Sequence, residues 1–477
     1  VKVRLNFMEA KLMKQKSGFS GQIGFVFAAA GSAVGVGNLW RFPYLAAKDG
    51  GGLFLIIYLI LVVTFGFTLL TTDIAIGRKT GKSAIYAYES MRSKWKFLGI
   101  LTFLVPVLIM TYYAVIGGWI LKYITIYLFS SGKEAVADGC FTGFISSPSS
   151  VWFSLLFMFL TALIVYNGVE KGIERVSKFI MPILLVMVIV IAIFSLTLKT
   201  TLDDGTVRTG LQGMMIYLKP DLTGVTVGRF LQITLDAMSQ LFFSLSVSMG
   251  IMITYGSYVK KDVNLNKAVS QIEIMDTAVA FLAGMMIIPA VFVFSGLDGM
   301  SAGPGLMFVS LPNVFYRMGF AGRIVGLIFF VLAGFAALTS CISVLESIVA
   351  NCMEIFHVDR KKTTGILSVI YLIATAVIAL GYSIFYVEVK LPNGSTGQLL
   401  DIMDYISNSF LMPFISLLSA ILIGWIMKPS WIAEEMELNG EKFSRKKLYN
   451  VMIKYIMPLI MIILFLQSTG LLNMITK

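Results

Sequence analysis

Long apolar runs alternate with short polar segments along almost the whole chain. A helix that crosses a membrane needs roughly 20 apolar residues, and eleven of the runs are long enough. They cover approximately residues 22–47, 52–77, 97–129, 150–168, 173–198, 226–257, 267–295, 321–356, 363–384, 399–427 and 449–473. The pattern predicts an all-α polytopic membrane protein with about 11 transmembrane helices.

Composition strengthens this prediction. The chain is 57% hydrophobic and only 13% charged, whereas soluble domains have about 45–50% apolar and about 25% charged residues. Residues 1–21 are polar and contain no apolar core, so we expect a cytoplasmic N-terminal tail and not a cleaved signal peptide.

The basic residues indicate an orientation. Lys and Arg number 38 against 26 Asp and Glu, a net charge of +12. Most of the 38 lie in six polar segments that share one side of the membrane if the N-terminus is cytoplasmic, which is where such residues are enriched. Because the charges are dispersed along membrane-flanking segments, they suit a surface of anionic lipid and argue against a nucleic-acid partner.

The first apolar run is interrupted. Residues 31–38 read Gly-Ser-Ala-Val-Gly-Val-Gly-Asn, and the flanking residues 25–30 and 39–47 look like two halves of one helix. Within lipid, non-helical backbone is tolerated only where it is buried in protein or lines a polar cavity. The interruption therefore predicts a binding site near the membrane midplane, as in secondary transporters.

A second interruption, at residues 240–250, falls in the sixth run. If residues 22–198 and 226–427 are two inverted five-helix repeats, with 449–473 as an additional eleventh helix, both breaks occupy matching positions. The alternative is that the small residues only allow close helix packing.

Broken helices offer two kinds of chemistry. A half-helix N-terminus suits a carboxylate, whereas unwound carbonyls and helix C-termini suit a hard cation. Oxygen-bearing side chains of the kinds that sodium prefers stand at Asn38, Ser244, Asp276, Thr339 and Ser340.

With these motifs in view, the sequence resembles the neurotransmitter:sodium symporter family, and its bacterial amino-acid transporters in particular. The resemblance covers about residues 20–475. The matching stretches are 31–43, 48–52, 75–78, 111–113 with Trp119, 240–244, 254–258, Ala283-Gly284 before Pro289, 303–305 with Leu311-Pro312, Thr339-Ser340 and 401–404.

The resemblance implies sodium-coupled transport of an amino acid in a bacterial cytoplasmic membrane, with two sodium sites. The first sodium would contact Ala33, Asn38, Ser244, Asp276 and the substrate carboxylate. The second would contact Gly31, Val34, Ala336, Thr339 and Ser340. The substrate would lie among Ala33, Val36, Gly37, Ile109, Tyr113, Phe243, Ser246, Met249, Ser340 and Val344.

The resemblance also implies two gates. Arg41 and Asp404 would pair across an outer vestibule once it shuts, and Phe243 would close over the substrate. At the inner end, Lys16 and Glu354 would form the matching gate.

Several departures from the family pattern refine the function. Gly35 stands where amine transporters have Asp, which favours an α-amino acid with its own carboxylate. Chloride-dependent members use a Tyr, a Gln and two Ser side chains; Tyr58, Gln240 and Ser244 match three of them, but Ala280 replaces the last hydroxyl. Because Asp276 replaces a usual Asn beside the first sodium, we expect it to supply the negative charge of chloride.

Other features leave questions open. Ser248 replaces a usual Gly and Asp73 replaces a usual Glu, and we expect no counterpart of the twelfth helix common in the family, so the pocket size and a homodimer are undecided. Two alternatives to sodium symport of hydrophobic or aromatic amino acids are a sodium-dependent sensor without net flux and a proton-coupled carrier. We find no nucleophile–base pair or metal-ligand cluster in the sequence, so an enzyme is not expected.

Overall fold

The computed structural model describes residues 18–130, 132–392 and 394–471, and most of them are helical. The α-helices are α2 (Gln22–Ala33), α3 (Val36–Lys48), α4 (Gly52–Leu61), α5 (Phe67–Thr80), α6 (Ala84–Met91), α7 (Lys96–Phe129), α8 (Cys140–Ile145), α9 (Pro148–Tyr166), α10 (Arg175–Thr197), α11 (Gly210–Leu218), α12 (Val227–Ser244), α13 (Ile251–Ser257), α14 (Leu265–Ser295), α15 (Leu311–Arg317), α16 (Phe320–Phe356), α17 (Arg360–Ala379), α18 (Leu399–Asp404), α19 (Met412–Ile421), α20 (Ser430–Met436), α21 (Lys446–Val451) and α22 (Met457–Ser468).

Short irregular elements join or interrupt these helices. The π-helical turns are η1 (Val62–Gly66), η4 (Val169–Glu174), η6 (Leu306–Ser310), η8 (Tyr405–Leu411), η9 (Leu422–Met427) and η11 (Met452–Ile456). The 3₁₀ turns are η2 (Ser93–Trp95), η3 (Lys133–Val136), η5 (Leu297–Gly299), η7 (Leu380–Tyr382) and η10 (Leu438–Gly440). Two antiparallel hairpins pair β1 (Lys199–Thr201) with β2 (Val207–Thr209), and β3 (Val389–Lys390) with β4 (Thr396–Gly397).

Most of the predicted spans are present. Among the described residues, nine continuous helices are long and apolar enough to cross a membrane, and the pair α2 and α3, bent by 54°, makes a tenth. Two further helices, α12 and α13, are separated by residues 245–250 and lie where the sixth span is expected. The all-α membrane fold is therefore confirmed, while the count of eleven and the inverted repeat remain predictions.

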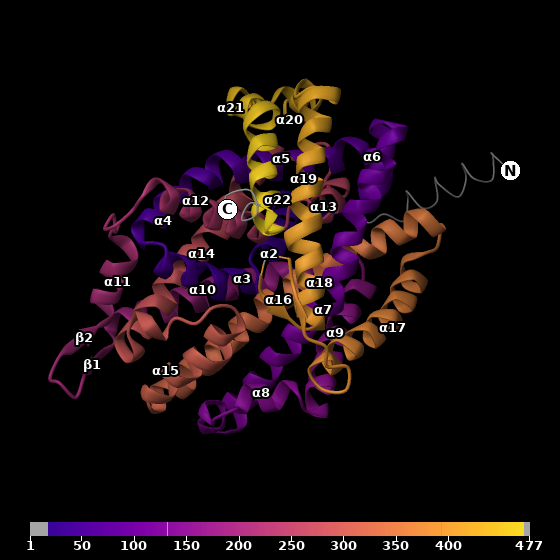
Figure 1. Ribbon diagram of the computed structural model, residues 1–477. Helices are drawn as coiled ribbons and strands as arrows, with labels where there is room; N and C mark the ends of the chain where they lie inside the picture. The colour runs from indigo at the N-terminus through magenta and orange to yellow at the C-terminus, as the bar shows by residue number, and fades with distance from the viewer. Residues whose placement is uncertain (1–17, 131, 393, 472–477) are drawn as a thin grey trace.

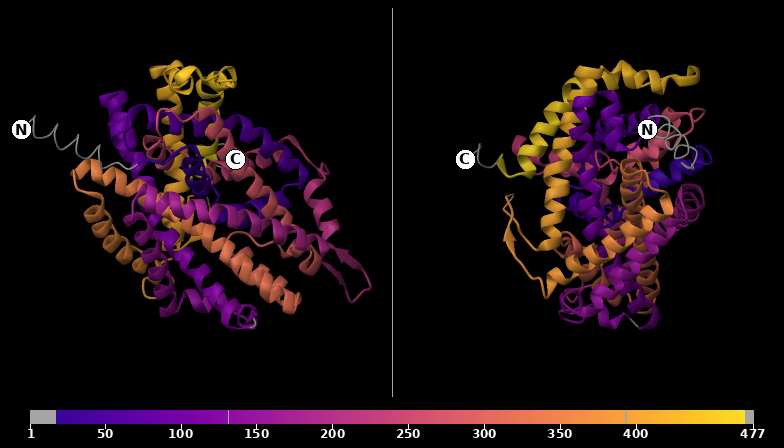
Figure 2. Two further views of the ribbon diagram at one scale, coloured as in Figure 1. Left: turned by 180° about the vertical axis from the view of Figure 1, so that it is seen from behind. Right: turned by 90° about the vertical axis from the view of Figure 1, so that its right-hand side faces the viewer.

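The molecule has two distinct ends (Figure 1). Helices α6, α20 and α21 lie at one of them, which we call the α20 end, while α8, α15 and the β1–β2 hairpin lie at the opposite, hairpin end. Figure 2 shows the same separation from two further sides. The broken helix α2/α3 lies in the interior between the two ends.

Polar side chains fix where several helices begin. Thr226, Asn264 and Asp359 each accept a hydrogen bond from a backbone N–H of the first turn of α12, α14 and α17. Such N-caps satisfy donors that the helix itself leaves unpaired. The start of α12, which carries part of the candidate site, therefore has a local sequence cause.

Close packing holds the broken helices against their neighbours. Helix α13 packs against α5, and a Cβ built on Gly77 would lie 1.9 Å from the Ile253 carbonyl oxygen. No other residue fits at this position, so the α5–α13 contact depends on that glycine. Helix α13, the second half of the second broken helix, is thereby fixed to the span that contains α5.

Candidate functional site

The first break lies between α2 and α3. Helix α2 ends at Ala33, and α3 begins at Val36. The Gly35 N–H donates to Asn38 Oδ1 at 3.3 Å, and the Val36 N–H donates to the Tyr113 hydroxyl at 3.4 Å. The N-terminus of α3 therefore points its backbone donors into a buried space, which is a favourable place for an anionic group.

The second break lies between α12 and α13 and has unusual backbone geometry. Ser246, Ser248 and Gly250 have φ values of +52°, +61° and +74°. A positive φ is uncommon for residues other than glycine, so the surroundings must hold both serines. The Ser246 hydroxyl donates to the Ser32 carbonyl at 2.9 Å, which ties the second break to the first.

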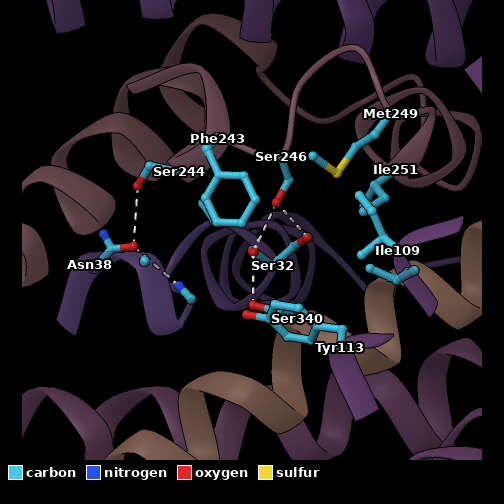
Figure 3. Close-up of a pocket in the computed structure, with 14 residues that line it drawn as sticks. Ser32, Asn38, Ile109, Tyr113, Phe243, Ser244, Ser246, Met249, Ile251 and Ser340 are labelled. Carbon is cyan, nitrogen blue, oxygen red and sulfur yellow. Dashed lines mark hydrogen bonds between the residues drawn. The ribbon is translucent and has the colours of Figure 1, made fainter. Parts of the chain in front are cut away.

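The two breaks enclose a small pocket (Figure 3). Its volume is about 30 Å³, space for one or two water molecules, so an amino acid can bind only if the lining moves apart. The ring of Phe243 lies beside Ser32, between the two broken helices. The lining residues are Ser32, Ala33, Gly35, Gly37, Asn38, Ile109, Tyr113, Phe243, Ser244, Ser246, Met249, Ile251, Ser340 and Val344.

Nearly all the predicted substrate residues thus share one pocket. Val36 is the exception, because it lines the neighbouring cavity, although its N–H meets Tyr113. Sequence reasoning missed Ser32 and Ile251 as lining residues. The available signals were the position of Ser32 inside the first break and that of Ile251 directly after the second.

Three predicted sodium ligands form one buried cluster. The Asn38 amide donates to Asp276 Oδ1 at 2.9 Å, and the Ser244 hydroxyl is 2.8 Å and 3.0 Å from the two carboxylate oxygens. Asn38 and Asp276 are fully buried, and Ala33 lines the same pocket. Within the described residues, this carboxylate hydrogen bonds only with Asn38 and Ser244. A buried carboxylate without a cationic side chain is costly, so the cluster suits a bound cation.

The second predicted sodium set lies where α2 contacts α16. A Cβ built on Gly31 would lie 3.2 Å from Thr339 Cβ. The Thr339 hydroxyl donates to the carbonyl of Ala336 at 3.2 Å, and Ser340 donates to the Ser32 carbonyl at 3.1 Å. Val34 is buried at the end of α2. The hydroxyls of Thr339 and Ser340 therefore lie beside the end of α2, without an acidic side chain in the set, and the second sodium site remains a prediction.

A larger cavity of about 490 Å³ adjoins the central pocket on the side of the hairpin end, and we call it the vestibule. Arg41 and Asp404 both line it. Arg41 donates to Ser239 at 2.7 Å, whereas Asp404 accepts from Tyr112 at 2.8 Å and Asn408 at 2.6 Å. The structure thus gives each predicted gate residue neutral partners.

The structure describes only one of the two residues of the predicted inner gate. Lys16 lies outside the described residues. Glu354 accepts hydrogen bonds from the Ser83 N–H, at 3.1 Å to each carboxylate oxygen, and from the Ser83 hydroxyl. The start of α2 is anchored elsewhere, since the Ser20 N–H donates to Glu174 at 2.8 Å. Sequence reasoning missed this role of Glu174.

The residues that correspond to a chloride site are also buried. Tyr58 and Gln240 are at most 1% exposed, and neither amide atom of Gln240 has a hydrogen-bond partner within the described residues. Ala280 is buried and brings no hydroxyl. A polar site is therefore present, but it lacks one of the four expected donors.

Comparisons with known proteins agree over nearly the whole chain. The profile of the sodium:neurotransmitter symporter family matches residues 16–137 and 140–476. The chain is 35% identical to the uncharacterized sodium-dependent transporter YhdH of Bacillus subtilis, over 95% of this chain and 98% of that protein. A sodium-dependent transporter of Haemophilus influenzae is 31% identical over 95% of this chain and 98% of its own length.

A solved structure supports the same assignment. The crystal structure of MhsT in complex with L-phenylalanine is 36% identical and covers 95% of this chain and 99% of its own, with a TM-score of 0.80. The resemblance inferred from the motifs is thus confirmed. The chain belongs to the sodium:neurotransmitter symporter family and is a transporter, not an enzyme.

Proposed function

We propose that this protein is a sodium-coupled symporter that imports hydrophobic or aromatic amino acids by alternating access. The observation that carries the proposal is the buried cluster of Asn38, Ser244 and Asp276, which directly adjoins the pocket between the two broken helices. A cation in the cluster and a substrate in the pocket would be neighbours, so each can stabilise the other.

The substrate is best described as a zwitterion with an apolar side chain. The N-terminus of α3 and the Tyr113 hydroxyl offer donors to a carboxylate. At the other end, Ile109, Met249 and Val344 present an apolar lining. Gly35 brings no carboxylate for an amine lacking its own. The 36% identical MhsT, solved with L-phenylalanine, supports this class of substrate.

Two sodium ions are proposed as the driving ions. One would bind Asn38, Ser244 and Asp276 together with the substrate carboxylate, which couples the two binding events. The other would bind the hydroxyls of Thr339 and Ser340 and carbonyls near the end of α2. We assign the α20 end, which carries many Lys and Arg residues, to the cytoplasm of a bacterial inner membrane.

Transport is proposed to be independent of chloride, because the Asp276 carboxylate supplies a negative charge within 3.0 Å of the Ser244 hydroxyl. A nearby anion would be repelled by that charge, and a neutral water could satisfy the Gln240 amide. Uptake is expected to continue when external chloride is replaced by gluconate. A collapse of uptake under gluconate would overturn this part of the proposal.

Uptake by sealed proteoliposomes tests the function directly. With an inward sodium gradient, labelled leucine and phenylalanine are expected to accumulate, and Asp276→Asn is expected to lower uptake at least about tenfold, the effect of a loss of 1.4 kcal/mol. The matched control is Asp298→Asn, an exposed carboxylate outside the site. Sodium-dependent binding without accumulation would indicate a sensor, and accumulation indifferent to sodium would indicate proton coupling.

A further inference from the structure

The segment between α12 and α13 is held from outside by two other spans. The Ser248 N–H donates to Asp73 Oδ2 on α5 at 2.7 Å, and the Ser248 hydroxyl hydrogen bonds with the Ser416 hydroxyl on α19. All three residues are at most 3% exposed. We call Asp73, Ser248 and Ser416 the linker clamp.

The clamp explains how a serine keeps a backbone conformation that favours glycine. Ser248 has φ +61°, a conformation that costs free energy for a residue with a side chain. Two buried hydrogen bonds, one from its backbone and one from its side chain, offset that cost. Gly at this position would adopt the same φ freely but could not bond to Ser416.

The clamp lies next to a wall of the substrate pocket. Met249 follows Ser248 directly and lines the pocket (Figure 3). On its other side is Gly250, where an added Cβ would lie 3.3 Å from atoms of both Ala84 and Thr102. The backbone on both sides of Met249 is thus packed or hydrogen bonded, so the direction of the Met249 side chain is set from outside the pocket.

We propose that Asp73 and Ser416 act as positioning residues that limit the size of the substrate side chain; this inference rests on the proposed amino-acid transport. A wide side chain can bind only if Met249 retreats. That movement turns the backbone at Ser248 and breaks buried hydrogen bonds of the clamp. The clamp therefore selects leucine-sized side chains over the indole of tryptophan.

The test compares sodium-driven uptake of leucine and tryptophan in proteoliposomes, as Vmax/KM for each. Ser248→Gly removes the hydroxyl bond and frees the backbone, so the tryptophan-to-leucine ratio is expected to rise about tenfold, the effect of 1.4 kcal/mol. Ser416→Ala removes the same bond from α19 without touching the pocket. It is expected to move the ratio in the same direction.

A double-mutant cycle tests whether Ser248 and Ser416 act on specificity through their shared hydrogen bond or only stabilise the fold. Because Ser248→Gly and Ser416→Ala remove one shared bond, the double variant is expected to match Ser248→Gly and not the product of both effects. The control is Ser368→Ala on α17, whose hydroxyl, within the part of the chain that the structure describes, bonds only to the Thr364 carbonyl of its own helix, at 2.6 Å. It should leave the ratio unchanged.

Several results would overturn the inference. One is an unchanged ratio in both single variants while leucine uptake continues, and another is additive effects in the double variant. If Ser248→Gly does not fold, Ser416→Ala alone decides. Absence of sodium-driven leucine uptake by the unmodified protein would instead refute the proposed function, so the two failures are distinguishable.

Discussion

The vestibule and the α20 end differ in how their charged side chains are paired. At the α20 end, Arg360 binds Glu346 at 2.6 Å and Arg78 binds Glu435 at 2.6 Å, and both acidic side chains are at most 5% exposed. In the vestibule, Arg41 and Asp404 share one cavity but bond to neutral partners. The two buried carboxylates at the α20 end thus have cationic partners, whereas Arg41 and Asp404 do not pair with each other, although Asp236 in the same vestibule pairs with Lys48 at 3.3 Å.

This difference indicates which end can move at low cost. Breaking a buried ion pair leaves an uncompensated charge and is strongly unfavourable. Exchanging the neutral partners of Arg41 and Asp404 for each other costs less, because neither charge is left without a partner. We therefore expect the vestibule to close by pairing Arg41 with Asp404, while the α20 end opens only when substrate and sodium binding offset its ion pairs.

The largest effect is expected from Glu346→Gln at the α20 end. It leaves the Arg360 guanidinium buried without its counter-charge, which costs about 3 kcal/mol. The apparent melting temperature in detergent should fall by about 5 °C. The matched control is Glu434→Gln, because Glu434 pairs with Lys79 but is 69% exposed, and its loss should leave the melting temperature unchanged. Equal shifts in melting temperature in both variants would show that the buried ion pair stabilises the protein no more than the exposed one does.

A smaller effect, on rate and not on stability, is expected from Asp404→Asn. The amide can still accept from Tyr112 but cannot form an ion pair with Arg41, so sodium-driven uptake should fall about tenfold, equivalent to 1.4 kcal/mol. Asp401→Asn is the control, since Asp401 also lines the vestibule but caps α18 through the Gln398 N–H. A loss of melting temperature as large as that of Glu346→Gln would show that Asp404 stabilises the fold instead.

The smallest effect is expected from Gly37→Ala at the boundary of vestibule and pocket. The added Cβ would lie 3.1 Å from two ring atoms of Phe243, so the ring must shift by a few tenths of an ångström. The KM for phenylalanine should rise about threefold, or roughly 0.7 kcal/mol. Gly365→Ala on α17, where nothing lies within 4 Å of the new Cβ, should leave KM unchanged.

The spans and both helix breaks could be predicted because their causes are local. Apolar runs of sufficient length dictate helices in lipid, and the small residues around Gly35 and Ser246 disrupt them. The family resemblance placed Asn38, Ser244 and Asp276 together, and these side chains do hydrogen bond with one another, while their role as sodium ligands remains a prediction. Within the segment expected to be non-spanning at residues 199–225, the sequence did not predict the β1–β2 hairpin.

Contacts between distant residues were beyond sequence reasoning. Nothing near Asp73 or Ser248 in the sequence reveals that they meet, since 175 residues separate them. The same holds for Glu174 in η4, which accepts a hydrogen bond from Ser20, just before α2 and 154 residues away. Such pairs depend on how whole helices pack, and packing is set by shape over many residues at once.

The most direct test of the account measures the affinity of the purified protein for phenylalanine at several sodium concentrations, and the affinity for sodium with and without phenylalanine. If sodium and the substrate carboxylate are neighbours at Asp276, each ligand tightens the other by the same factor, and Asp276→Asn abolishes that factor. Phenylalanine affinity that is independent of sodium would contradict the central claim that the two broken helices build one coupled site.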